Sequence, residues 1–295
     1  MSINYSTSTR IARFGRGAVI LRGRNEALDE SALRSAAPTL FAEGKHSSRS
    51  DRYSHIPTFE VLKGLAREGF RPYEVRVGGS GDEDKRNHTK HLIRLRRDGM
   101  MPLVGGSHRE VVLLNSHDGT SAYKLMYGLF RLVCSNGLVI SDGTMSELRV
   151  PHKGDVVSQV IEGTYTVVSE GERVTERVGE MQAITLSRPE QLAYAESAAM
   201  LRWAPEAETG TSTVPVRAEQ VIMPRRRDDN TDRLWDVFNR AQENLVNGGN
   251  TYVGVRAGRS IHRTTRAVNG IDGNVNLNRA LWALTARMAE LKTGA

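Results

Sequence analysis

The residues whose types and spacing could carry chemistry are mostly cationic. Between Lys85 and Arg97 the chain has six Lys or Arg residues and no acid, and between Tyr252 and Arg266 it has four Arg and no acid. Clustered guanidinium and ammonium groups bind the phosphates of nucleic acids, and an aromatic side chain among them can stack on a base. The two basic blocks therefore favour an anionic polymer as the partner.

Each basic block suggests its own geometry. Alternating residues predict a β-strand from Thr89 to Arg97, and cations on one face of it would follow one another at ~7 Å, close to the phosphate spacing of an extended strand. In the second block the intervals of three and four between arginines would form one stripe along a helix. The predicted nucleic-acid contacts are Lys85, Arg86, Lys90, Arg94, Arg96, Arg97, Tyr252, Arg256, Arg259, Arg263 and Arg266.

An acidic stretch leaves a second interpretation open. From Asp155 to Glu196 there are eight acids and three Arg. The basic blocks could pair with this acidic middle of the chain, or they could be ordinary solvated surface. Either arrangement would give the blocks a structural role instead of a binding one.

Catalytic patterns are scarce. His88 and His91 lie three residues apart, but in a strand they point to opposite faces, and the Gly119 that follows His117-Asp118 predicts a turn. The single Cys134 excludes an internal disulfide and any zinc site that needs two thiolates. We expect no enzyme, no catalytic residue, no metal site and no cofactor.

The elements that must position the basic blocks are a sheet and several helices. A helix over 57–69 is followed by strands at 73–77, 89–97 and 110–115 and by a hairpin around Asn136-Gly137. After Pro151 the apolar period lengthens to that of helices, which we place at 156–186, 187–203, 231–247 and 276–292. The prediction is an α+β fold, in which an antiparallel sheet follows a short helix and precedes several helices that cover one face.

Composition predicts how the chain is organised. Residues 1–54 are rich in Ser, Thr, Arg and Gly, with clustered apolar residues only at Ala18–Leu21, and we interpret them as a mobile basic arm with at most one short ordered strand. We interpret 55–203 as the α+β core with its basic sheet and 204–295 as a helical C-terminal region. The net charge is +7, from 41 Lys and Arg against 34 Asp and Glu. No apolar leader or membrane-length apolar run is seen, so we expect a cytoplasmic protein without membrane contact.

Four stretches carry a resemblance to a known family. They are Val111–Tyr123, Gly128–Leu138, Trp235–Leu245 and Asn278–Trp282, and the most specific string is the Arg-Leu-Val-Cys-Ser-Asn-Gly of 131–137. These stretches resemble the phage, prophage and plasmid family labelled domain of unknown function 932, over roughly residues 50–292. The resemblance implies a bacterial mobile element as the setting and no activity.

The order of elements is also similar to that of single-strand annealing proteins of the Red beta, Erf and Sak type. That similarity implies a homo-oligomeric ring or filament on single-stranded DNA, with Lys90, Arg94 and Arg96 along the groove. We therefore expect a single-stranded DNA-binding and annealing protein of recombination. The alternatives are a protein-binding antagonist of a host defence system, or a structural or interaction protein without DNA affinity.

Overall fold

The computed structural model describes residues 9–23, 26–49, 55–103, 106–131, 136–140, 148–150, 155–203, 214–256 and 259–294. The chain forms two compact units, residues 1–171 and 172–295. The division falls inside helix α3 (Val156–Ala183), whereas the sequence suggested a boundary near residue 203. It lies earlier because helix α4 (Arg188–Arg202) contacts the helices that follow it, so these helices form one core.

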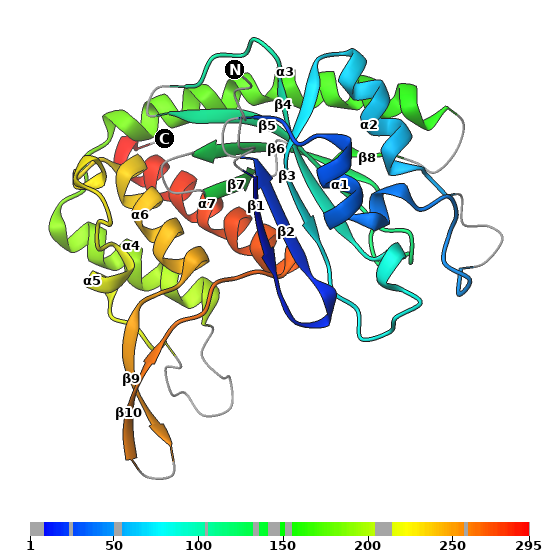
Figure 1. The fold of residues 1–295 in the computed structure, drawn as a ribbon. Coiled ribbons are helices and arrows are strands. Elements are labelled where there is room, and N and C mark those ends of the chain that lie inside the picture. The colour runs from blue at the N-terminus through cyan, green and yellow to red at the C-terminus, as the bar shows by residue number, and fades with distance from the viewer. Residues whose placement is uncertain are drawn as a thin grey trace, which may run out of the picture. The chain divides into compact units, whose positions relative to one another are not determined.

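The first unit is built on an antiparallel sheet, which confirms the predicted α+β class. The strands from β1 to β7 are neighbours in chain order, and β8 pairs with β6 (Figure 1). The strands are β1 (Thr9–Arg13), β2 (Val19–Gly23), β3 (Phe70–Val77), β4 (His91–Arg97), β5 (Ser107–Asn115), β6 (Lys124–Arg131), β7 (Asn136–Ile140) and β8 (Leu148–Arg149). Asn136 pairs with Arg131, so the expected turn residue Asn136 begins a strand instead.

The N-terminal segment differs from the mobile arm expected for residues 1–54. Within the part of it that the structure describes, β1 and β2 extend the sheet, and helix α1 (Glu30–Ala36) follows them. Leu21, Leu33 and Leu40 are buried. The prediction failed because these leucines are far apart in the sequence and join a core that the rest of the unit supplies.

Helices α2 (Thr58–Arg67) and α3 cover one face of the sheet. The predicted helix over 57–69 is confirmed, and Gly69 ends it with a φ of +83°. Helix α3 continues without a break through three glycines, two of which lie against the sheet. A Cβ at Gly163 would come within 2.3 Å of Leu148, and one at Gly171 within 2.0 Å of Tyr127. These two positions lack a side chain because the helix and the strands approach closely there.

The second unit is a helical cluster from which one pair of strands extends. Besides α4 it contains α5 (Ala218–Val221), α6 (Leu234–Asn247), α7 (Ile271–Thr293), β9 (Thr251–Arg256) and β10 (Arg259–Thr264). The predicted cap of α4 is confirmed, because the backbone N–H of Ser187 donates to Glu190 at 2.7 Å. In the core, the rings of Phe238 and Trp282 meet edge to face at 6.4 Å.

The two longest helices are α3, with 28 residues, and α7, with 23. Charged residues recur along both of them, as Glu170, Arg173 and Arg287 illustrate. Among the described residues, no helix is at once long enough and apolar enough to span a bilayer.

Candidate nucleic-acid interface

The first basic block does not form the predicted cationic groove. Arg94 and Arg96 share one face of β4, but that face is buried, and the side chain of Arg94 is only 1% exposed. Both arginines donate to the buried carboxylate of Glu110 on β5, Arg94 to Oε2 and Arg96 to Oε1 at 2.8 Å. The groove prediction for Arg94 and Arg96 is therefore wrong, because a carboxylate on the neighbouring strand neutralises them inside the protein.

These groups belong to a longer buried array, which we call the arginine–glutamate ladder. Glu74 on β3 accepts hydrogen bonds from Arg22 and Arg76, each at 2.6 Å. Burial raises the pKa of Glu74, but the positive charges of Arg76, Arg22 and Arg94 outweigh it and hold that pKa well below its usual range. The ladder combines four guanidiniums with two carboxylates, namely Arg22, Arg76, Arg94 and Arg96 with Glu74 and Glu110.

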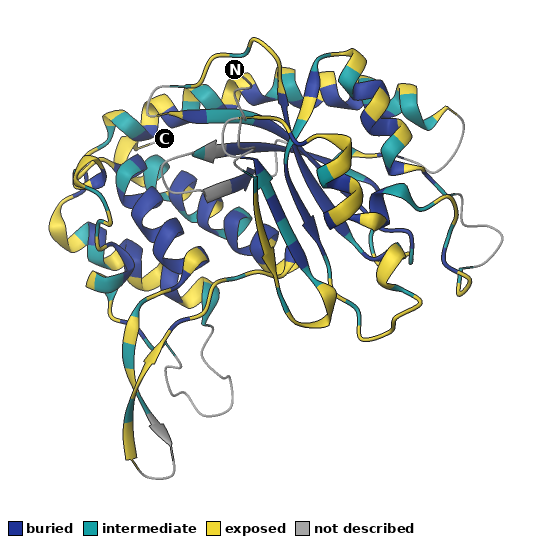
Figure 2. Cartoon of the chain, in the orientation of Figure 1, coloured by how far each residue is buried: buried dark blue, intermediate teal, exposed yellow. Residues whose placement is uncertain are grey.

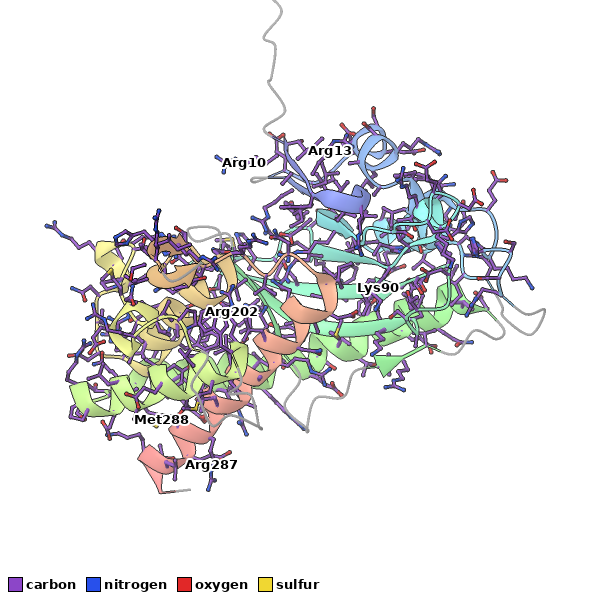
Figure 3. The ribbon with its side chains drawn as sticks, turned by 90° about the horizontal axis from the view of Figure 1, so that it is seen from below. Arg10, Arg13, Lys90, Arg202, Arg287 and Met288 are labelled. Carbon is purple, nitrogen blue, oxygen red and sulfur yellow. The ribbon has the colours of Figure 1, made fainter. Side chains whose placement is uncertain are left out.

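The other cations of the first block lie nearer the surface, and two of them are paired locally. Lys85 lies 3.5 Å from Asp82 and Arg86 lies 2.9 Å from Glu83, so their acidic partners come from the preceding loop. Lys90 is half-buried next to the first residue of β4 (Figure 3). The partners found for Lys85 and Arg86 lie outside the acidic stretch Asp155–Glu196 that the sequence offered as an alternative.

Arg96 and Arg97 do line a cavity at the end of β4, in the first unit. The cavity has a volume of about 380 Å³, and Tyr73, His108 and Arg109 also contribute to its wall. The guanidinium of Arg96 lies over the ring of Tyr73, 4.3 Å from its centroid. The sequence reading missed this cavity because His108 and Arg109 precede the apolar run from which the strand β5 was recognised.

The second basic block is a two-stranded ribbon and not the expected helix. Strands β9 and β10 pair antiparallel, with Tyr252 opposite Arg263 and Arg256 opposite Arg259. The helical prediction is wrong because Thr, Tyr and Val dominate β9, and β-branched and aromatic residues favour strands. We call the paired strands, Thr251–Arg256 and Arg259–Thr264, the arm. Arg266 follows the arm and is exposed.

The arm carries an open cationic face. It extends away from helices α5 and α6 (Figure 1), and its described side chains are exposed or half-buried (Figure 2). Tyr252 and Arg263 flank Gly254, since a Cβ there would lie 3.1 Å from Arg263 Cδ and 3.6 Å from Tyr252 Cε2. Among the residues that the structure describes, Arg259 and Arg263 have no acidic partner. The exposed side chain of Arg263 and the half-buried ring of Tyr252 therefore lie side by side on the arm.

The base of the arm is fixed firmly to the helices. The guanidinium of Arg202 on α4 donates to the backbone carbonyls of Leu245 and Arg266. Gln220 Nε2 donates to the carbonyl of Thr251 at 2.8 Å, and Arg225 Nη2 donates to the carbonyl of Gly248, three residues before the arm. An isolated two-stranded ribbon is barely stable in water, so these bonds at its base hold the arm in position.

A second unpredicted feature is a group of buried histidines in the first unit. The hydroxyl of Thr58 lies 2.9 Å from His91 Nε2 and 3.3 Å from His117 Nε2, and Asn115 Nδ2 donates to it at 3.1 Å. His91 Nδ1 lies 3.1 Å from the carbonyl of Thr89, an acceptor, so this nitrogen carries the proton and Nε2 accepts from Thr58. The arrangement is a hydrogen-bonded network that joins α2 to the strands.

Further histidines border this network. The ring of His55 lies 4.5 Å from that of His117, and the rings of His46 and His88 are 5.3 Å apart. Burial lowers the pKa of His91 to about 4, and burial together with the neighbouring histidines lowers that of His117 to about 2. Across the described part of the chain, no three His, Cys, Asp or Glu side chains are placed to hold a metal ion. His91 and His117 are therefore uncharged at pH 7, and their hydrogen bonds serve to hold α2 against the strands.

The histidine network predicts a pH-dependent stability. Because the pKa values of His91 and His117 are lowered by folding, the unfolded chain binds protons first as the pH falls below about 6.5, and the free energy of unfolding must then decrease. Urea unfolding between pH 7.5 and pH 5 should show a loss that approaches about 3 kcal/mol per pH unit when both residues contribute.

Two variants separate this effect from general acid sensitivity. His117→Gln should reduce the slope by about one proton, whereas His262→Gln on the exposed arm should leave it unchanged. A stability that stays constant from pH 7.5 to pH 5 would contradict the assignment of neutral, buried histidines.

Comparison with known proteins places the chain in a family without an assigned activity. The family model described as Domain of unknown function (DUF932) matches residues 45–282. The chain is 47% identical over 277 residues to UPF0380 protein YafZ and 46% identical over 277 residues to UPF0380 protein YfjQ, both of Escherichia coli (strain K12). Each match covers 94% of this chain and 96% of the relative. No solved structure matches. The resemblance found in the sequence is thus confirmed: the chain belongs to the DUF932 family.

Proposed function

We propose that this protein binds single-stranded DNA through its arm. The observation that carries the proposal is the pairing of the exposed Arg263 with the half-buried Tyr252 on one face of the β9–β10 ribbon. Arginines contact successive phosphates, and an aromatic ring stacks on any base whose face is free. Base faces are free only in an unpaired strand, so the tyrosine favours single strands over a duplex.

The proposal moves the DNA contact from the strand β4 to the arm. Of the residues predicted from sequence, it retains Tyr252, Arg259, Arg263 and Arg266, whose side chains the structure describes, and Arg256 on the same ribbon. Binding of this kind needs no cofactor. It implies a cytoplasmic location, because the DNA of a bacterial cell such as that of Escherichia coli lies in the cytoplasm.

Replacing both Arg259 and Arg263 by Ala should weaken binding to a single-stranded oligonucleotide by about tenfold or more, because two phosphate contacts and their counterion release are lost. Fluorescence anisotropy with a labelled strand measures this directly. The unfolding midpoint should change little, since both side chains are exposed and make no ion pair within the described structure.

A matched control removes the same charge elsewhere. Arg173 on α3 and Arg287 on α7 are exposed, and Arg287 extends from the helix into solvent (Figure 3). If the DNA contact is local to the arm, replacing both Arg173 and Arg287 by Ala should leave the affinity within about twofold of the wild type. If only the net charge matters, this control should weaken binding as much as the loss of Arg259 and Arg263 does. A duplex that binds as tightly as the single strand would instead indicate that the ribbon enters a groove, as β-ribbons can. Absence of any salt-dependent DNA affinity would favour the protein-binding alternative.

We also propose that copies of the chain assemble, as annealing of two strands would require. The sheet ends at β1, whose residues are largely exposed and whose outer edge has no strand partner among the described residues. Arg10 and Arg13 lie on this edge strand (Figure 3). Unpaired strand edges readily add another strand. Light scattering should find an oligomer on single-stranded DNA, and a strict monomer at micromolar concentration with and without DNA would contradict assembly.

A further inference from the structure

Gly254 is an unexpected residue in the middle of the arm. Glycine in a strand has no side chain to pack and loses more backbone entropy than other residues, so it weakens the strand. The backbone does not require it here, because the φ of Gly254 lies outside the left-handed region and the register of β9 with β10 runs through it without a bulge. A close contact remains as the reason for a glycine at this position.

The close contact comes from two side chains on the same face of the arm. Tyr252 and Gly254 share this face because side chains alternate along β9, and Arg263 lies directly opposite Tyr252. A Cβ at Gly254 would lie 3.1 Å from Cδ and 3.4 Å from Nε of Arg263, and 3.6 Å from Cε2 of Tyr252. The ring of Tyr252 and the stem of Arg263 therefore lean over the glycine, one from each strand.

The glycine lets these two side chains lie along the ribbon. This contact accounts for the half-buried state of Tyr252 in a ribbon of only two strands. The half-buried Ile261 lies directly opposite Gly254 and adds an apolar side chain to the same row. An aromatic ring supported in this way is a surface on which a nucleobase can stack.

The ring lies close to the path between two cations. Arg259 and Arg263 are both exposed and are four residues apart on β10, which is about 14 Å along the strand. Ile261 is midway between them in the sequence and on the same face. A single strand whose phosphates contact both arginines would pass the row of Gly254 and Ile261 and could turn a base toward it.

We infer that Gly254 is a positioning residue that holds Tyr252 as a stacking platform, so that the arm selects a strand with accessible bases over a bare polyanion. This inference rests on the proposed DNA binding and specifies its ligand class. Neutralisation of phosphates by arginine is available to any polyanion, whereas stacking requires a base. A larger side chain at position 254 would occupy the space that the ring and the arginine stem now share.

Fluorescence anisotropy with a labelled oligothymidine and with an abasic strand of the same length separates the two contributions. We expect the wild type to bind the thymidine strand about tenfold more tightly, because a base that stacks on an aromatic side chain adds an affinity of this order. Gly254→Val should remove this preference and leave the affinity for the abasic strand within about twofold of the wild type. Its melting temperature should not fall, since valine favours strands and glycine does not.

Ser260→Val is the matched control. Ser260 is exposed and lies on the other face of the arm, so this variant adds the same side chain away from Tyr252 and should keep the preference. Tyr252→Leu is a second test of the platform. It retains an apolar side chain but has no aromatic ring, and it too should remove the preference.

The outcomes distinguish this inference from the proposed function. If neither strand binds, the proposed function fails and the inference fails with it. If the wild type binds both strands equally, the arm remains a phosphate-binding surface and the stacking platform is overturned. A preference that Gly254→Val retains, or that Ser260→Val also removes, would contradict the role assigned to Gly254.

Discussion

Replacing Glu110 by Gln is expected to lower the free energy of unfolding by about 3–5 kcal/mol, because the change leaves buried guanidiniums without their counter-charge. Glu110 is buried and accepts from both Arg94 and Arg96. Once the carboxylate is gone, the desolvation cost of both guanidiniums remains and the compensating attraction is lost. Urea unfolding followed by circular dichroism measures the change.

The matched control is Glu83→Gln. Glu83 also pairs with an arginine, Arg86 at 2.9 Å, but its side chain is 80% exposed. An exposed pair of this kind contributes at most about 1 kcal/mol, so this variant should unfold close to the wild type. Equal, small effects of the two variants would mean that the ladder is solvated and would reopen Arg94 and Arg96 as surface cations.

Replacing Gly171 by Ala is expected to cost about 1–3 kcal/mol, even though Ala normally stabilises a helix. A Cβ at this position would lie 2.0 Å from Tyr127, whose ring is buried between α3 and the sheet, so either the ring or the helix must move. The melting temperature should fall accordingly.

Helix α3 offers its own control for this prediction. Gly179 lies in the same helix and a Cβ there would meet nothing within 4 Å. Gly179→Ala should therefore stabilise the protein by about 0.5–1 kcal/mol through helix propensity alone. The two substitutions should shift the melting temperature in opposite directions, and a stabilising Gly171→Ala would contradict the close approach of α3 to Tyr127.

The sequence predicted the elements whose signals are local. The helix over 57–69, the capped start of α4 and the strands at 73–77, 89–97 and 110–115 all follow from apolar period and capping residues, and the structure confirms them. It did not predict β1 and α1, and it allowed at most one short strand where β2 lies, because the few apolar residues there are buried only by partners distant in the chain. Local composition does not reveal burial by residues that are distant in the sequence.

The candidate site shows the same limit. Alternation correctly placed Arg94 and Arg96 on one face of a strand, but whether that face meets solvent or Glu110 depends on the register of β4 with β5. In the second block, arginines at intervals of three and four suggested a helix, whereas Thr251, Tyr252 and Val253 favoured the strand that is found. The histidine network likewise joins segments that only the fold brings together.

The proposed function rests most directly on the arm, and the salt dependence of single-strand binding tests it. For the wild type, the logarithm of the binding constant should fall linearly with the logarithm of salt concentration, by about 0.7 for each phosphate contacted. Loss of both Arg259 and Arg263 should reduce that slope by about 1.4 as well as weaken binding. A double variant with the same slope and affinity as the wild type would contradict the assignment of the arm as the DNA-binding surface.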